Sequence, residues 1–111
     1  MSPPAPVDEG PSLSEVRASF NVVDEVLVRA IVERLRLADQ AAAAKSRAGL
    51  GVIDEGREEE QRARRRELVI EALAAHTDGD VDAAIALVED VYATLVAASR
   101  RRQAAAISRS S

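Results

Sequence analysis

The run from Ser12 to Arg47 contains neither proline nor glycine, and this uninterrupted segment constrains the fold more than any other feature. Two apolar stripes follow it at steps of three and four residues, which is the pattern of an α-helix. One stripe consists of Phe20, Val23, Leu27, Ala30, Arg34, Leu37 and Ala41, and the other of Val28, Ile31, Leu35, Ala38, Ala42 and Lys45. We predict a single helix of roughly 35 residues, or ~50 Å at ~1.5 Å per residue.

The remaining sequence provides two shorter helices. The segment 48–53 contains Gly49 and Gly51 and is predicted to be a loop. Asp54 is expected to cap a second helix that ends near residue 75. After a turn at 76–79, Asp80 or Asp82 starts a third helix that ends near residue 103 or a few residues beyond. Two helices of this size cannot cover a first helix of ~50 Å, so we expect a partner chain to bury part of it.

The composition agrees with a single all-α domain. Hydrophobic residues make up 47% of the 111 residues but aromatic residues only 2%, so the apolar content is mainly Ala, Val, Leu and Ile. These residues suit helix packing better than the alternation of strands. Residues 1–11 are rich in proline, glycine and acidic residues and are predicted to form a disordered leader. We expect the helical domain to span 12–104 and a flexible tail to follow at 105–111.

Charge and residue content argue against several classes of protein. The net charge is −4, which makes a general affinity for nucleic acid or acidic membranes unfavourable. The chain has no cysteine, His76 is its only histidine, and no metal site is visible in the sequence. The N-terminal sequence lacks the features of a signal peptide, and no stretch approaches the ~20 apolar residues of a membrane span. We therefore expect a soluble, cytoplasmic protein.

Several polar side chains interrupt the apolar stripes. Arg34 and Lys45 lie in the stripes of the first helix, and Arg17 lies in line with Leu13, just before Phe20. The stripe of the third helix comprises Val81, Ile85, Val88, Tyr92, Leu95 and Val96 and continues onto Ser99 and Gln103. A buried charge without a partner is costly. Salt bridges to glutamates or a bound anion can supply the partners, and the convergence of these polar positions favours the anion.

The spacing of the basic residues indicates a shared site. Arg34 and Lys45 are 11 residues apart on nearly one face, so they can bracket a small anion over ~16 Å. Arg17 is 28 residues from Lys45, or ~42 Å along the same helix, and cannot reach the same small ligand from its own chain. If Arg17 belongs to the site, it comes from a second subunit.

The polar residues have the spacing Arg17, Arg34, Lys45, Asp54-x-x-Arg57-Glu58 and Ser99-x-x-x-Gln103. They are accompanied by the strings Val-Asp-Glu-Val-Leu-Val at 23–28, Glu-Arg-Leu-Arg-Leu-Ala at 33–38 and Asp-Glu-Gly-Arg-Glu at 54–58. In these features the chain resembles the all-helical chorismate mutase family over residues 14–104. The resemblance implies an intertwined homodimer of three-helix chains with two equivalent sites and with no metal or cofactor.

The resemblance also implies a role for eight residues in binding chorismate, a small dianion. The expected reaction is the Claisen rearrangement of chorismate to prephenate, which depends on substrate orientation and on preorganised donors at the ether oxygen. The implied contacts are Arg17 of the partner and Arg34 for the two carboxylates, Lys45 and Gln103 for the ether oxygen, and Glu58 and the backbone of Asp54 for the ring hydroxyl. Arg57 and Ser99 complete the implied contacts, with Ser99 near a carboxylate.

Four positions depart from the family pattern and leave the natural substrate open. Ala41 stands where valine is usual, Gly51 where proline is common, and Gln61 and Arg100 where the family has aliphatic residues. Ala41 could enlarge the pocket. The alternative substrate is 4-amino-4-deoxychorismate, because Glu58 could pair with an ammonium group as readily as with a hydroxyl.

Two further functions are less favoured. Isochorismate pyruvate lyases resemble this chain but lack the string found here at 54–58. A non-catalytic helical interaction module could use the arginine-rich runs 62–66 and 100–102. We interpret these runs instead as a solvated helix face, which is balanced by Glu55, Glu58, Glu59, Glu60 and Glu67.

Overall fold

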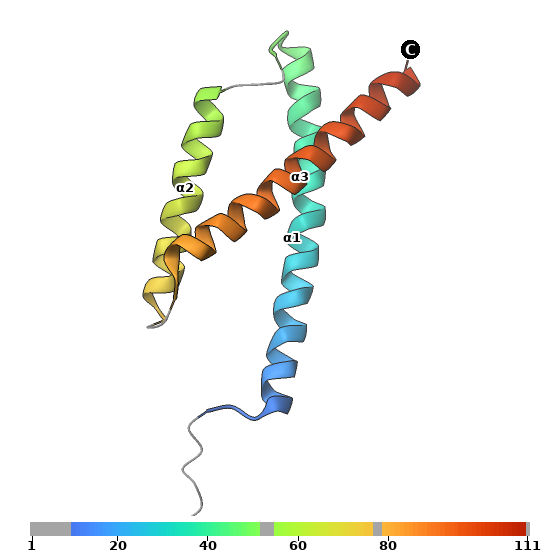
Figure 1. The fold of residues 1–111 in the computed structure, drawn as a ribbon. Helices are drawn as coiled ribbons and strands as arrows, with labels where there is room; N and C mark the ends of the chain where they lie inside the picture. The colour runs from blue at the N-terminus through green and yellow to red at the C-terminus, as the bar shows by residue number, and fades with distance from the viewer. Residues whose placement is uncertain (1–9, 52–54, 77–78, 111) are drawn as a thin grey trace, which may run out of the picture. The chain divides into compact units, whose positions relative to one another are not determined.

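The structure is a computed structural model that describes residues 10–51, 55–76 and 79–110. Its helices are α1 (Leu13–Arg47), α2 (Glu55–Ala74) and α3 (Val81–Ser110), and no strand lies within the described ranges (Figure 1). The all-α prediction is therefore confirmed, including the very long first helix. Most of the predicted leader, residues 1–9, and the predicted cap at Asp54 lie outside the described residues.

Side-chain caps begin two of the helices. The backbone N–H of Glu15 donates to Ser12 Oγ at 3.1 Å, which starts α1. The backbone N–H of Ala83 donates to Asp80 Oδ1 at 3.0 Å, which starts α3. Each cap satisfies a backbone donor that has no partner inside its helix. Ser12 caps α1, and of the two candidates for the start of α3, Asp80 is the residue that caps.

The end of α1 is fixed by a glycine in the left-handed region. Gly49 has a φ of 70°, and its N–H donates to the carbonyl of Ser46 at 3.1 Å. The N–H of Leu50 donates to the carbonyl of Lys45 at 2.9 Å. This pair of bonds is the Schellman arrangement, which closes a helix where only glycine adopts the required φ without strain. It anchors the backbone of Lys45 in the last turn of α1.

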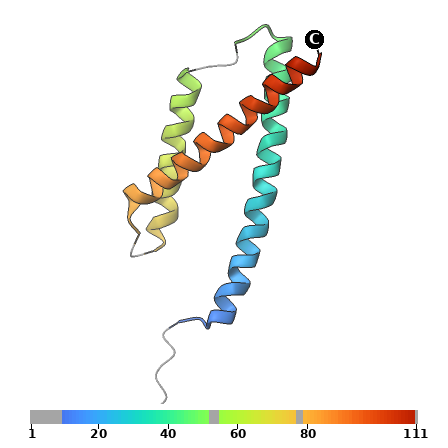
Figure 2. The same ribbon diagram turned by 45° about the vertical axis from the view of Figure 1, so that its right-hand side comes forward.

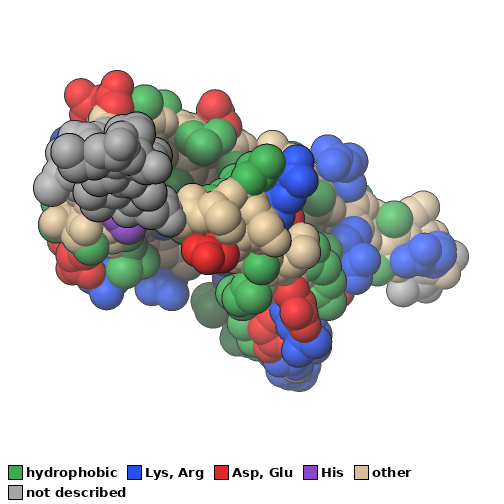
Figure 3. All heavy atoms as spheres, turned by 90° about the horizontal axis from the view of Figure 1, so that it is seen from below, with side chains coloured by type: hydrophobic (Ala, Val, Ile, Leu, Met, Phe, Trp, Pro, Cys, Tyr) green, Lys and Arg blue, Asp and Glu red, His purple; other side chains and the backbone are tan. Residues whose placement is uncertain are grey.

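The chain divides into two compact units, residues 1–34 and 35–111, and α1 runs through both. In the first unit the described structure is one helix, so its apolar side chains have no other element to pack against. Phe20 is 61% exposed and Val23 60%, and hydrophobic side chains lie at the surface on the face seen in Figure 3. The exposed large hydrophobic residues of this unit are Leu13, Phe20, Val22, Val23, Val26, Leu27, Val28 and Val32.

The second unit brings three helical segments together. Arg65 of α2 bridges to Glu89 of α3 with 2.7 Å between Nη2 and Oε2, and its guanidinium lies 4.6 Å from the centre of the Tyr92 ring. Arg102 of α3 bridges to Asp39 of α1 with 2.8 Å between Nη2 and Oδ2. Both ribbon views are consistent with α3 passing beside α2 at its start and beside the C-terminal part of α1 further along (Figures 1 and 2). Charged contacts therefore join α3 to both of the other helices.

The faces turned inward in this unit follow the predicted periodicity. Every residue of the predicted α3 stripe is half-buried or buried. On α1, Leu35, Ala38 and Ala42 of the second stripe are half-buried, whereas Leu37 and Ala41 of the first stripe are exposed. No hydrophobic side chain whose burial the structure defines is fully buried. Within this unit the chain therefore covers the second stripe of α1 and leaves the first open.

The third helix is longer than the predicted domain. It continues to Ser110, so the segment 105–110 has helical structure rather than the irregular structure of a tail. A run of alanine at 104–106 explains this continuation, because alanine has the highest intrinsic helix propensity. The flexibility expected of this segment stays a prediction.

Candidate active site

Gln103 lies against α1. Its Nε2 donates to the carbonyl oxygen of Ala38 at 3.4 Å, and the neighbouring Arg102–Asp39 pair joins the same two helices. The hydrogen bond to Asp39, with the charge of that carboxylate, raises the pKa of the Arg102 guanidinium. The prediction that Gln103 faces inward is confirmed. Its side chain reaches Ala38, which lies on the same α1 stripe as Lys45.

Lys45 lies two turns beyond Ala38 on the same stripe of α1, or roughly 10 Å along the axis. Its side chain is half-buried, and its carbonyl is held by the Schellman bonds at the helix end. The ammonium of this side chain is a charged hydrogen-bond donor. Lys45 and Gln103 therefore both lie on the inner faces of the second unit.

Glu58 is half-buried on α2 and pairs with Arg100 of α3. The distance from Arg100 Nη2 to Glu58 Oε1 is 3.1 Å, and the side chains are 49% and 45% exposed. The sequence pointed to Arg100 as a departure from the family pattern and as part of an arginine-rich run, and its pairing with Glu58 was not predicted. Residues 42 apart in the chain meet here, and helical periodicity alone does not reveal such a pair.

Ser99 is buried, at 9% exposure, and no other residue whose burial the structure defines is buried. Its Oγ donates to the carbonyl of Leu95 at 3.0 Å, within α3. The hydroxyl proton is thus used by the helix itself, although the oxygen can still accept a hydrogen bond. To donate to a ligand carboxylate, as the resemblance implies, the Ser99 hydroxyl would have to rotate away from Leu95.

The other predicted site residues are Arg57, Arg34, Arg17 and Asp54. Arg57 is 63% exposed, and its Nη1 lies 3.8 Å from Oε2 of Glu60 on the same helix. Arg34 is half-buried and Arg17 exposed, and both belong to the first unit. Arg17 makes no hydrogen bond or ion pair within the part of the chain that the structure describes. Asp54 lies outside the described residues.

The arginine-rich run of α2 is only partly a solvated face. Arg62 pairs with Glu59, and Arg64 lies 3.2 Å from Glu67, as expected for exposed pairs along one helix. For Arg65 the expectation was wrong, because its side chain is only 18% exposed and bridges to α3. The inward position of Arg65 could have been predicted from the helical spacing of residues along α2. The half-buried residues of α2 recur at helical steps as Glu58, Gln61, Arg65, Val69 and Leu73.

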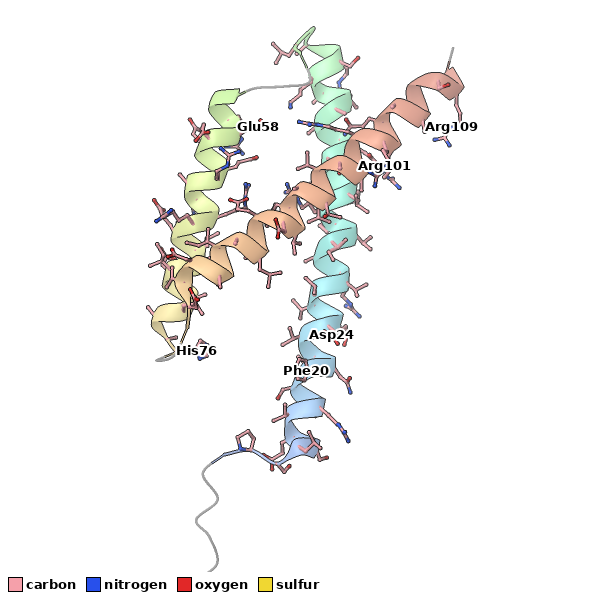
Figure 4. All side chains as sticks on the ribbon, in the orientation of Figure 1. Phe20, Asp24, Glu58, His76, Arg101 and Arg109 are labelled. Atoms are coloured by element: carbon pink, nitrogen blue, oxygen red, sulfur yellow. The ribbon has the colours of Figure 1, made fainter. Side chains whose placement is uncertain are left out.

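No group of three or more histidine, cysteine, aspartate or glutamate side chains in the described ranges could hold a metal ion. No helix in the described part of the chain is both long and apolar enough to cross a membrane. His76, to which the sequence assigned no role, is exposed after the end of α2 (Figure 4).

The chain is all-helical, and the inner faces of its helices carry the ammonium of Lys45, the amide of Gln103 and the carboxylate of Glu58. It belongs to the class of proteins that can hold a small polar ligand by charge and hydrogen bonds. The sequence matches the family chorismate mutase type II over residues 16–104, and the chain belongs to this family. No curated protein and no solved structure matches the chain significantly.

The family match bears directly on the predicted function. It covers nearly all of the predicted helical domain and confirms the assignment as a chorismate mutase, an isomerase that acts on a small molecule. None of the comparisons supports a 4-amino-4-deoxychorismate mutase, an isochorismate pyruvate lyase or a non-catalytic interaction module.

Proposed function

We propose that the chain rearranges chorismate to prephenate as a homodimer with two equivalent sites, each completed by Arg17 of the partner copy. The single observation that carries the reaction is the family match over residues 16–104. The site residues come from the resemblance and are supported by the half-buried positions of Lys45, Glu58 and Gln103.

In this proposal Lys45 and Gln103 act on the ether oxygen of the substrate. As the C–O bond breaks, negative charge grows on that oxygen, and preorganised donors bind the transition state more strongly than the ground state. Lysine suits this position because its ammonium is a compact point charge. Loss of one such donor typically raises the barrier by ~3–4 kcal/mol.

The two arginines hold the substrate in a reactive shape. Arg34 and Arg17 of the partner bind the two carboxylates, because a guanidinium forms paired hydrogen bonds with a carboxylate. Fixing both ends of a flexible dianion favours its compact, chair-like conformer and lowers the entropic part of the barrier. Glu58 accepts a hydrogen bond from the ring hydroxyl and sets the orientation of the ring.

Exposed surface supports the second copy. The large hydrophobic side chains on the first unit need cover, and a second copy of the same helix offers a matching apolar surface. Arg17 lies three residues before Phe20, on the same side of α1. A copy that covers Phe20 therefore also meets Arg17.

The first test compares chorismate turnover by the wild type, Lys45→Ala and Arg47→Ala. Arg47 is an exposed cation in the same last turn of α1 and serves as the matched control. We expect wild type and Arg47→Ala to convert chorismate to prephenate, and Lys45→Ala to lose roughly 10²–10³-fold in kcat. A wild type without activity on chorismate would overturn the proposed function. Equal activity of Lys45→Ala and Arg47→Ala would overturn the role of Lys45.

A further inference from the structure

Arg100 brings a positive charge next to the carboxylate of Glu58. We assign this carboxylate to the ring substituent of the substrate. Arg100 and Glu58 are 3.1 Å apart between Nη2 and Oε1, and the bond links α3 to α2. By the resemblance, Arg100 stands where an aliphatic residue is usual. An arginine at this position therefore changes the charge of the site and not only its shape.

The pair leaves Glu58 able to bind a ligand. A carboxylate has two oxygens with about four lone pairs, and Arg100 donates to Oε1. Glu58 Oε2 takes part in no hydrogen bond or ion pair within the described ranges. Glu58 can thus remain paired with Arg100 through one oxygen while the other accepts from a ligand.

The charge of Arg100 distinguishes between a hydroxyl and an ammonium group. A lone carboxylate attracts an ammonium by charge and accepts from a hydroxyl by hydrogen bonding, so it favours the cation. A guanidinium on the same carboxylate offsets its negative charge and repels a second cation. The hydroxyl is neutral and loses little. Both side chains are about half exposed, so solvent and salt screen this effect without removing it.

We propose that Arg100 is a specificity-determining residue that makes the site select a neutral ring hydroxyl over a ring ammonium, and hence chorismate over 4-amino-4-deoxychorismate. The inference rests on the proposed function, because it takes Glu58 as the contact of the ring substituent. In the sequence, Arg100 was one of the departures from the family pattern that left the amino substrate open. The pairing with Glu58 reverses that interpretation, because it makes Arg100 favour chorismate.

The test measures kcat/KM for both substrates in the wild type, Arg100→Met, Arg100→Lys and Arg101→Met. Methionine keeps the length of the side chain without its charge, and lysine keeps the charge. Arg101, labelled on α3 in Figure 4, is the next residue and lies outside the Glu58 pair, so it controls for loss of any arginine there. A screened unit charge next to the substituent corresponds to roughly a three- to tenfold change in relative kcat/KM.

We expect Arg100→Met to raise the kcat/KM of the amino substrate relative to that of chorismate by roughly three- to tenfold. This change in the ratio should be smaller at high salt. Arg100→Lys and Arg101→Met should keep the wild-type ratio. An unchanged ratio in Arg100→Met, while chorismate still reacts, would overturn this inference and leave the proposed function intact. An equal shift in Arg100→Lys would also overturn it, because the charge would not be the cause. A wild type inactive on chorismate would overturn both.

Discussion

Arg102 and Asp39 join α3 to α1 by a 2.8 Å hydrogen bond between Nη2 and Oδ2. The residues next to them, Gln103 and Ala38, are joined by a longer bond of 3.4 Å. A charge-assisted hydrogen bond is shorter and stronger than one between neutral groups. The Arg102–Asp39 pair is therefore the firmer of the two contacts and sets where Gln103 meets α1.

We expect Asp39→Asn and Arg102→Gln to lower kcat by loosening the position of Gln103. The loss should be roughly three- to tenfold, well below the ~10² that a 1 Å misplacement can cause. KM should change little, because neither residue is assigned to the substrate. The control is Arg101→Gln, which removes an adjacent guanidinium outside this pair. Steady-state kinetics with chorismate provides the test, and unchanged kcat in both variants would show that Gln103 is held without the pair.

The end of α1 offers a test of stability. Gly49→Ala forces an L-residue into a φ of 70°, which costs about 1–2 kcal/mol. Each kcal/mol lowers the Tm of a domain of this size by roughly 4–8 °C. The matched control is Gly51→Ala, because Gly51 does not have a left-handed φ and a Cβ there meets no atom. Thermal unfolding followed by circular dichroism makes the comparison, and equal Tm values for the two variants would contradict the role of Gly49.

The sequence predicted the helices well because their signals are local. The absence of glycine and proline from residue 12 to 47 is enough to predict α1, and Ser12 and Asp80 are recognisable as caps from their residue types alone. The helical period also predicted which face of α3 turns inward, including Ser99 and Gln103. Each of these features depends on residues within a few turns of each other.

Contacts between helices were the part that could not be predicted. The Glu58–Arg100 and Asp39–Arg102 pairs join residues 42 and 63 positions apart. Helical phase defines a face but not the offset or crossing of two helices, and those two quantities decide which charges meet. The arginine-rich runs were for this reason interpreted as solvated, although Arg65 and Arg100 bridge between helices.

The apolar side of α1 predicts that the proposed dimer depends on Phe20, which is 61% exposed in the single chain and labelled in Figure 4. Full burial of such a side chain contributes about 2 kcal/mol. Because each chain contributes one Phe20, the dimer buries two such side chains. Phe20→Asp should therefore raise the dissociation constant of the dimer by about 10³-fold or more. Ala18→Asp introduces the same charge about 200° around the helix and is the control. Sedimentation equilibrium measures both, and equal dissociation constants would place the interface elsewhere.

Mixing inactive variants tests whether each site takes Arg17 from the partner. Arg17→Ala and Lys45→Ala chains, inactive alone, are mixed in equal amounts and allowed to exchange. Random pairing makes about half of the dimers mixed, and each mixed dimer has one of its two sites intact, so about a quarter of wild-type activity should return. Arg34→Ala mixed with Lys45→Ala is the control, because both residues are assigned to the same chain and every site would stay damaged. No recovery in well-exchanged Arg17→Ala and Lys45→Ala dimers would show that Arg17 does not act across the dimer, and recovery in the control would show that Arg34 and Lys45 do not come from the same chain.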